Sequence, residues 1–220
     1  SKLEGTAFAV QAHLALLSIY ERSRDWAKAT DIAHKLNASG HGSFQGRLAH
    51  YLCEQAESTD TPQDHASKIR LLQQAIDTAP HAARAPLALA PRLSVLAQEL
   101  NCIDDALLFL EHLYQHTASL DVLQAIVSLR TAKGEIDTSA WFGKHLEREP
   151  SLVAATQWIA NEKFEHQQFH PQVLRALERA AKPLQRYRCA ACGFEATQHF
   201  WQCPGCQAWD SYPPKRIEEL

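Results

Sequence analysis

The 220-residue sequence predicts an all-α solenoid of paired helices, followed by a small cysteine-rich module. Over residues 1–181, apolar residues recur at intervals of three and four, and no stretch alternates apolar and polar residues as a strand would. Short turns rich in Ser, Gly and Pro separate the helical segments, which is typical of antiparallel helix pairs. Four of the six cysteines lie together in residues 189–206 and define the module.

The composition excludes several classes of protein. Hydrophobic residues make up 45% of the sequence and charged residues 21%, which is typical of a soluble globular protein. The formal net charge of −3 is too acidic for a general nucleic-acid-binding protein. The longest apolar run, residues 14–20, is far shorter than the ~18–20 residues of a membrane-spanning helix. We find no G-x-S-x-G, phosphate-loop or dinucleotide motif and expect no catalytic residues.

A pattern of large apolar, large apolar, small and large apolar residues occurs three times with the same internal spacing. Its copies are Leu16, Trp26, Ala29 and Leu36; Leu93, Ile103, Ala106 and Leu113; and Ile126, Ile136, Ser139 and Leu146. The small residue allows two helices of a pair to cross closely. A period near 34 residues is typical of tetratricopeptide repeats, so we predict an all-α solenoid of tetratricopeptide-type helix pairs. Such an array exposes a concave surface that can hold segments of partner proteins.

A non-repetitive helical bundle is the alternative, because the second unit matches the pattern poorly and two prolines interrupt the third. We expect the first helix of the third unit to begin late, near Pro91, or to bend, since Pro86 and Pro91 lack the amide hydrogen that a helix needs. The polar residues 58–64 are the expected place of an insertion between repeats.

The four clustered cysteines, Cys189, Cys192, Cys203 and Cys206, form two C-x-x-C pairs, as expected of a metal site. We predict a tetrahedral site of four thiolates, which suits either zinc or a single iron. Such a site has no open position for water or substrate, so hydrolytic metal catalysis is not expected. Thiolates that stay reduced indicate a cytosolic compartment.

The module is too small to fold on its own core, so we expect the metal to supply the missing folding free energy. The linker before it is short, and we therefore predict that the module docks on the helical array. Tyr187, Trp201 and Trp209 are expected to pack against the last helix, residues 173–181. The domain division is a helical array, a linker, a metal-binding module and a tail: 1–181, 182–186, 187–214 and 215–220.

The remaining candidate ligands are weaker. His112 and His116, like His166 and His170, are four residues apart on one helix, but no third ligand is in view, and we expect these side chains to face solvent. His199 lies outside both C-x-x-C pairs and is expected to be an exposed strand residue. The isolated cysteines and three tryptophans are expected to be packing residues: Cys53, Cys102, Trp26, Trp141 and Trp158.

Residues 187–194 and 201–209 resemble the rubredoxin-type metal-binding tail of the lipopolysaccharide assembly protein B family, in which the tail follows a tetratricopeptide array. The resemblance implies that the four module cysteines are iron ligands. It also implies an adaptor, anchored at the cytoplasmic face of the bacterial inner membrane by an N-terminal helix absent from this chain. The implied partners are the committed-step lipid A deacetylase, a membrane-bound AAA protease and other lipopolysaccharide-assembly proteins.

Two other functions stay open on the sequence alone. An iron held by four thiolates can change oxidation state, so the module could be a rubredoxin-like electron-transfer protein. However, Gln207 stands where the second rubredoxin turn has glycine, and the gap between the two cysteine pairs is shorter than in rubredoxins. A zinc ribbon that binds nucleic acid is the other possibility, but the module region carries too small a positive charge to favour it.

Overall fold

The computed structural model describes residues 7–40, 44–58, 84–99, 101–162 and 168–220. The chain divides into two compact units, Ser1–Ala85 and Pro86–Leu220. Apart from the short strands of the module, the regular structure of the described residues is helical, followed by a C-terminal ribbon that carries four clustered cysteines. This confirms the predicted fold class. In the described part of the chain, no helix combines the length and apolarity needed to cross a bilayer.

The first unit contains α1 (Ala7–Ser23), α2 (Trp26–Ala38) and α3 (Gln45–Ser58), and each helix packs against the next. The ring of Trp26 stacks on that of Tyr51, with 5.8 Å between centroids, so it packs between helices as predicted. The buried face of α1 differs from the prediction: Leu16 is 38% exposed, whereas Leu17 is fully buried. Adjacent residues of a helix point about 100° apart, so only one of these two leucines can face α2.

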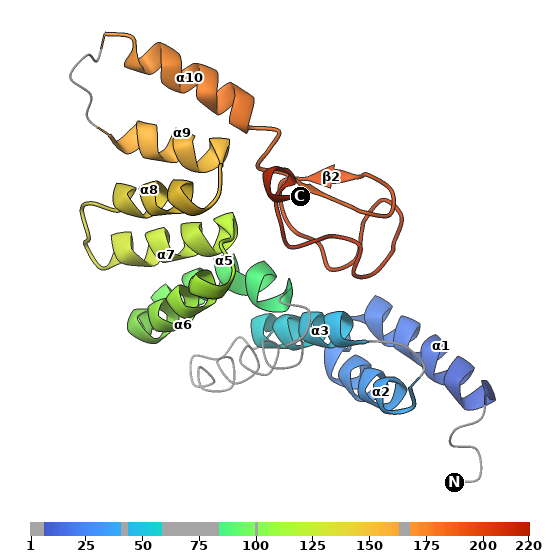
Figure 1. Cartoon of the computed structure of the whole chain (residues 1–220). Coiled ribbons are helices and arrows are strands. Elements are labelled where there is room, and N and C mark those ends of the chain that lie inside the picture. The colour runs from blue at the N-terminus through green and yellow to red at the C-terminus, as the bar shows by residue number, and fades with distance from the viewer. Residues whose placement is uncertain (1–6, 41–43, 59–83, 100, 163–167) are drawn as a thin grey trace. The chain divides into compact units, whose positions relative to one another are not determined.

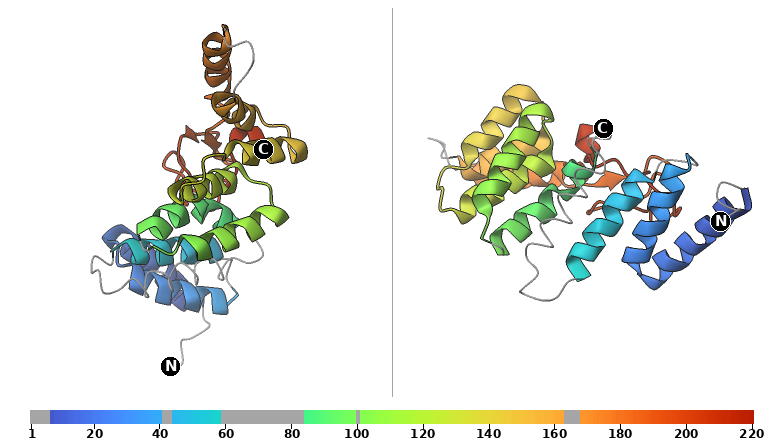
Figure 2. Two further views of the ribbon diagram at one scale, coloured as in Figure 1. Left: turned by 90° about the vertical axis from the view of Figure 1, so that its left-hand side faces the viewer. Right: turned by 90° about the horizontal axis from the view of Figure 1, so that it is seen from below.

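The second unit contains α5 (Arg84–Glu99) from Pro86 onward, and then α6 (Ile103–His116), α7 (Leu120–Ala132), α8 (Ser139–Arg148), α9 (Leu152–Asn161) and α10 (His170–Ala181). From α6 to α10, the helices follow one another in chain order, and each contacts the next (Figures 1 and 2). Large apolar side chains from this row fill a common core: Leu107, Leu110, Leu123, Ile126, Leu129, Phe142 and Val153. Trp141 and Trp158 pack against this core as predicted.

Two details of the repeat prediction differ in the structure. Of the two alternatives for the first helix of the third unit, the late start is wrong, because α5 runs from Arg84 to Glu99 with Pro91 inside it, while the bend stays a prediction. Ile136, the predicted equivalent of Ile103, is fully exposed. The reason is local: α7 ends at Ala132, so Ile136 lies in the connection before α8 instead of at a helix start. The expected insertion at 58–64 lies outside the described residues beyond Ser58.

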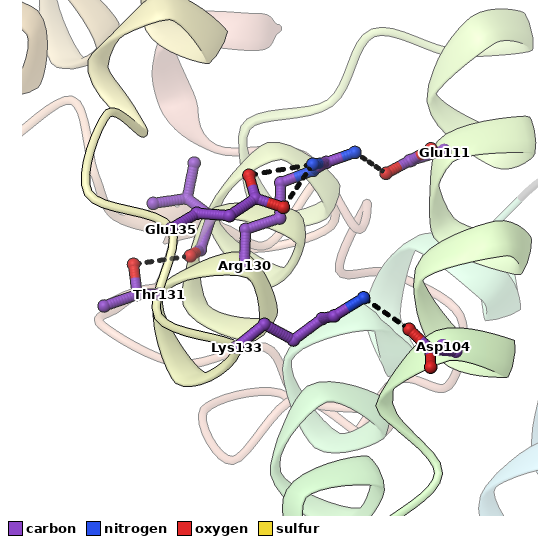
Figure 3. A network of polar contacts seen from close by, with 7 residues as sticks. Asp104, Glu111, Arg130, Thr131, Lys133 and Glu135 are labelled. Carbon is purple, nitrogen blue, oxygen red and sulfur yellow. Dashed lines mark hydrogen bonds and ion pairs between the residues drawn. The ribbon is translucent and has the colours of Figure 1, made fainter.

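A polar network joins α6, α7 and the connection after α7 (Figure 3). The Arg130 guanidinium of α7 donates to Glu111 of α6 and, over 2.7 and 2.8 Å, to both carboxylate oxygens of Glu135. It also lies 4.9 Å from the ring centre of Trp141 on α8. Lys133 Nζ is 2.6 Å from Asp104 Oδ1. The network therefore ties together the surfaces of three successive helices.

Candidate metal centre

The two C-x-x-C segments form similar turns. In the first turn, the Gly193 N–H donates to Cys189 O over 2.9 Å, and in the second the Gln207 N–H donates to Cys203 O over 2.8 Å. Gly193 has φ +76° and Gln207 has φ +59°, so both residues take the left-handed conformation that glycine adopts most easily. The departure from glycine at Gln207 therefore leaves the turn intact.

The turns bring the four predicted sulfur ligands together. All four Sγ atoms lie within 4.8 Å of one another. The separation is 3.8 Å between Cys189 and Cys206, and 3.7 Å between Cys192 and Cys203. With zinc–sulfur bonds of 2.3 Å, the edge of a sulfur tetrahedron is about 3.8 Å. The cluster is thus a metal-binding site whose geometry fits a tetrahedral ion, and the same donor set also suits iron.

The cysteines differ in how readily they ionise. Burial opposes ionisation of the Cys189 thiol, but contacts with Ser211 and with the backbone N–H groups of Cys192 and Ala191 outweigh it and lower its pKa to about 6. The pKa of Cys192 is raised to about 12: the Phe194 N–H favours its thiolate, but burial and the three neighbouring sulfur atoms outweigh this effect. Four thiolates in one cluster therefore need a cation to neutralise them.

Aromatic side chains of the module pack with two of the four cysteines, Cys189 and Cys203. Strands β1 (Tyr187–Arg188) and β2 (Glu195–Ala196) pair antiparallel. The buried Tyr212 hydroxyl donates to Phe194 O over 2.8 Å. Since the buried apolar cluster of the module includes Cys189 and Cys203 themselves, the metal ligands are part of its small core.

His199 is not the exposed strand residue that the sequence suggests. It lies outside both strands and is half-buried, with its ring 5.3 Å from that of Trp201 and 6.0 Å from that of Tyr187. Its Nε2 is 3.2 Å from Tyr212 O. Burial lowers the pKa of His199. The aromatic cluster of the module therefore includes the His199 ring, which the sequence pattern places outside it.

A buried polar cluster attaches the module to α7. The Tyr187 hydroxyl donates to Asp121 Oδ2. Asp121 Oδ1 accepts from Arg216 Nε over 2.9 Å and from Arg216 Nη2 over 2.7 Å, and Nη2 also lies 2.7 Å from Gln124 Oε1. Burial, reinforced by the Asp121 carboxylate, raises the pKa of Tyr187, which therefore stays a hydrogen-bond donor at neutral pH.

The segment after the module supplies two carboxylates to helix N-termini. Glu219 Oε1 accepts from the Leu120 N–H at the start of α7 over 2.9 Å. Glu218 Oε2 accepts from Ser151 Oγ over 2.8 Å and from the Val153 N–H over 3.2 Å, at the start of α9. Negative charge is favourable there, because the free N–H groups and the helix dipole make a helix N-terminus positive. The module and segment 216–219 thus dock on α7 and α9.

Sequence reasoning gave residues 215–220 no role, and it placed the aromatic residues of the module against residues 173–181. The Tyr187 hydroxyl instead reaches α7. Trp201 and Trp209 are half-buried, and the backbone of Trp209 pairs with that of Gln202 in an isolated antiparallel β-bridge. Their packing on the helical array stays a prediction.

The other candidate ligands do not form a metal site in the part of the chain that the structure describes. There, the four module cysteines make up the group of possible metal ligands that lie close together. The Nε2 atoms of His112 and His116 are 3.3 Å apart on the exposed face of α6. His170 Nε2 lies 2.9 Å from Ile159 O, and His166 lies outside the described residues. Cys53 is buried, as expected of a packing residue, and Cys102 is half-buried.

Comparison with known proteins also indicates a metal-binding module at the C-terminal end of the chain. Residues 187–214 match a family model described as "Rubredoxin metal binding domain". Lipopolysaccharide assembly protein B of Haemophilus influenzae is 26% identical to this chain over 249 aligned residues, and the protein of that name from Escherichia coli K12 is 25% identical over 253. Both alignments cover 96% of this chain. The resemblance to lipopolysaccharide assembly protein B is thereby confirmed.

The chain spans 63% and 64% of the length of these two lipopolysaccharide assembly proteins. The similarity therefore extends over the helices as well as the module, while it leaves about a third of each relative unmatched.

Proposed function

We propose that this protein takes part in lipopolysaccharide assembly as a non-enzymatic scaffold. The observation that carries the proposal is the similarity, over 96% of the chain, to proteins named lipopolysaccharide assembly protein B. The names of these relatives describe assembly and no reaction. The metal centre supports a structural role, because four protein thiolates fill a tetrahedral ion and leave no position for a substrate.

The finer proposal is an adaptor at the cytoplasmic face of the bacterial inner membrane. A tetratricopeptide-type array holds segments of partner proteins, and here it would present the committed-step lipid A deacetylase to a membrane-bound AAA protease. Cys189, Cys192, Cys203 and Cys206 would hold one metal ion, either iron or zinc. When bound, the ion supplies cross-linking free energy, ~10–16 kcal/mol in small zinc peptides. The module then holds segment 216–219 against α7 and α9.

A co-purification experiment tests the adaptor role. Tagged wild-type chain, a Cys203→Ser variant and a Cys102→Ser control are expressed in cells, and the deacetylase and the protease are measured in each pull-down. We expect wild type and Cys102→Ser to retain both partners, and Cys203→Ser to lose metal and most of the bound deacetylase. The role assigned to the module is wrong if Cys203→Ser keeps its metal and both partners.

The nature of the metal separates the scaffold from electron transfer. Elemental analysis and an optical spectrum identify the ion in the purified protein, and voltammetry measures whether it cycles reversibly. A colourless zinc protein removes the electron-transfer alternative. A zinc ribbon for nucleic acid predicts salt-sensitive binding of DNA or RNA, which a titration at low salt detects.

A further inference from the structure

We propose that the N-termini of α7 and α9 form a binding surface for an acidic peptide with the pattern Arg-x-Glu-Glu, and that segment 216–219 occupies this surface in cis. The acidic-peptide surface consists of Leu120, Asp121, Gln124, Ser151, Leu152 and Val153. The partner is thus a protein segment that carries a basic residue followed, two and three positions later, by two carboxylates.

Each charged side chain of the segment has its own place on this surface. The guanidinium of Arg216 lies on Asp121, a carboxylate that is only 2% exposed. Glu218 accepts from the start of α9, and Glu219 accepts from the start of α7. Since a cation meets a buried anion and two anions meet helix N-termini, the charge pattern of the surface is complementary to Arg-x-Glu-Glu and to its order.

Ser119 provides an independent indication that the surface can bind more than it now holds. Its side chain is fully buried, and its Oγ has no hydrogen-bond partner within the described part of the chain. Ser119 is the residue before α7, where a serine usually accepts from the first turn of its own helix, yet it makes no such bond. Glu219 takes the Leu120 N–H instead. The residue next to Leu120 thus carries a buried hydroxyl without a partner among the described residues, and an occupant with one more acceptor would satisfy it.

The contacts of segment 216–219 allow a separate peptide to take its place on the surface. The segment includes a single short 3₁₀ turn, Ile217–Glu219, and all four of its residues are half-buried. Its own backbone is held to the preceding chain by the Ile217 N–H donating to Arg186 O over 2.7 Å and the Glu218 N–H donating to Leu184 O over 3.3 Å. Because the segment is tethered to the module, it competes with a separate peptide as an intramolecular ligand. A separate peptide therefore binds with lower apparent affinity while the segment occupies the surface.

This inference rests on the proposed scaffold role, since an array of helices acts as a scaffold by holding segments of other proteins. It names one surface on the array and the chemistry of its partner. Its test measures peptide binding directly and uses neither the deacetylase nor the protease. A failure to bind peptide therefore leaves the co-purification result unaffected, and the two proposals can fail separately.

The probe is a fluorescein-labelled peptide of residues 215–220, Lys-Arg-Ile-Glu-Glu-Leu, with an amidated C-terminus. It is titrated by fluorescence anisotropy into the full chain, into the double variant Glu218→Gln and Glu219→Gln, and into a matched control, Glu147→Gln and Glu178→Gln, which changes the charge equally at exposed positions of α8 and α10. We expect the double variant to bind the peptide at least tenfold more tightly than the other two proteins do. A peptide with alanine for arginine and glutamine for both glutamates should not bind.

Hydrogen exchange supplies a second readout. In the double variant, the amides of Leu120 and Val153 should exchange faster than in wild type, and added peptide should restore their protection. Circular dichroism and metal content identify a variant that fails to fold, in which case Glu219→Gln alone is used with the same readouts. Equal affinity for all three proteins, unprotected amides at saturating peptide, or concentration-dependent dimers of the double variant that account for the signal would each overturn the proposal.

Discussion

The Asp121 carboxylate of α7 and the Arg216 guanidinium, which lie 95 positions apart in sequence, form a buried ion pair with two hydrogen bonds of 2.9 and 2.7 Å. The Asp121 side chain is 2% exposed and that of Arg216 is 12% exposed. The Tyr187 hydroxyl gives Asp121 a further donor. Burial alone disfavours a charged Arg216, but the Asp121 charge outweighs it and raises the pKa of the guanidinium. Arg216 therefore stays charged, and its pair with Asp121 joins the module to the helices.

Replacing Asp121 with alanine should strongly destabilise the second unit. The change leaves the Arg216 charge and the Tyr187 hydroxyl buried without their acceptor, and loss of one partner of a buried pair costs ~3–5 kcal/mol. Urea unfolding followed by tryptophan fluorescence measures the difference. Lys133→Ala is the control, because its ion pair with Asp104 is exposed and should contribute no more than ~0.5 kcal/mol. Similar midpoints for the two variants would contradict a structural role for the buried pair.

Removing the metal should loosen the starts of α7 and α9 as well as the module. The two ligands Cys189 and Cys203 belong to the apolar core of the module, and segment 216–219 follows that core directly. After chelation, hydrogen exchange should accelerate across residues 187–220 and at the amides of Leu120 and Val153, whose acceptors are Glu219 and Glu218. Helix α2, which belongs to the other unit, serves as the internal reference, and added zinc should restore protection.

The two residues that follow the second cysteine of each turn should respond oppositely to substitution. Gln207→Gly removes a side chain from a left-handed position and should keep the metal and gain up to ~1 kcal/mol, since glycine adopts this conformation without steric cost. Gly193→Ala places a side chain at φ +76° and should lose ~1 kcal/mol. A competition titration with a chelator compares the metal affinities. Equal losses in both variants would contradict the steric argument, because the left-handed backbone would then not decide the effect of the side chain.

The sequence predicts the helices and the cysteine cluster because both are local signals. A helix repeats its apolar positions every three or four residues, and each C-x-x-C pair lies within one turn. The identity of the buried positions is less predictable: Leu16 and Leu17 are chemically the same, and only the position of α2 makes Leu17 the buried one. Ile136 likewise fits the repeat by spacing but lies beyond the end of its helix.

The attachment of the module could not be predicted from local patterns. Asp121 is an ordinary acidic residue in the first turn of a helix, and the Arg216–Glu219 segment resembles any charged tail. These residues hold the module because the fold brings them into contact although more than ninety residues of chain separate them. Rules based on sequence spacing do not predict such a contact. Comparison of charge patterns alone would have left many equivalent pairings, since 47 residues of the chain are charged.

The stability of the second unit should fall as the pH decreases below about 6.5, and His145 should account for part of the fall. Its side chain is 2% exposed, and Nδ1 lies 2.7 Å from the Tyr114 hydroxyl. Burial lowers the pKa of His145, Arg148 lowers it further, and Glu149 and Glu218 oppose the change.

The direction of this pH dependence follows from the protons that the folded and unfolded chains bind. The unfolded chain protonates His145 near its ordinary pKa of about 6.5, while the folded chain does so only at lower pH, so acid favours unfolding. One such proton contributes a slope of at most ~1.4 kcal/mol per pH unit. Thermal melts of wild type and His145→Gln between pH 5 and 8 measure the effect. An unchanged slope in the variant would assign the acid sensitivity to other groups, such as His199.

Arg130 should contribute more to stability than the neighbouring Lys133, although both belong to the network that joins α6 and α7 (Figure 3). Arg130 bonds both oxygens of Glu135, pairs with Glu111 and lies over the Trp141 ring, whereas Lys133 makes one exposed pair. We expect Arg130→Ala to cost ~1–2 kcal/mol in urea unfolding, because the planar guanidinium supplies several contacts at once. Arg130→Lys should lose most of this stabilisation although it keeps the charge, since an ammonium cannot form the two-pronged contact or stack on the ring in the same way. Raising the salt concentration to 1 M should abolish the small effect of Lys133→Ala but leave most of the effect of Arg130→Ala. If Arg130→Lys instead restored full stability, charge alone would stabilise the network.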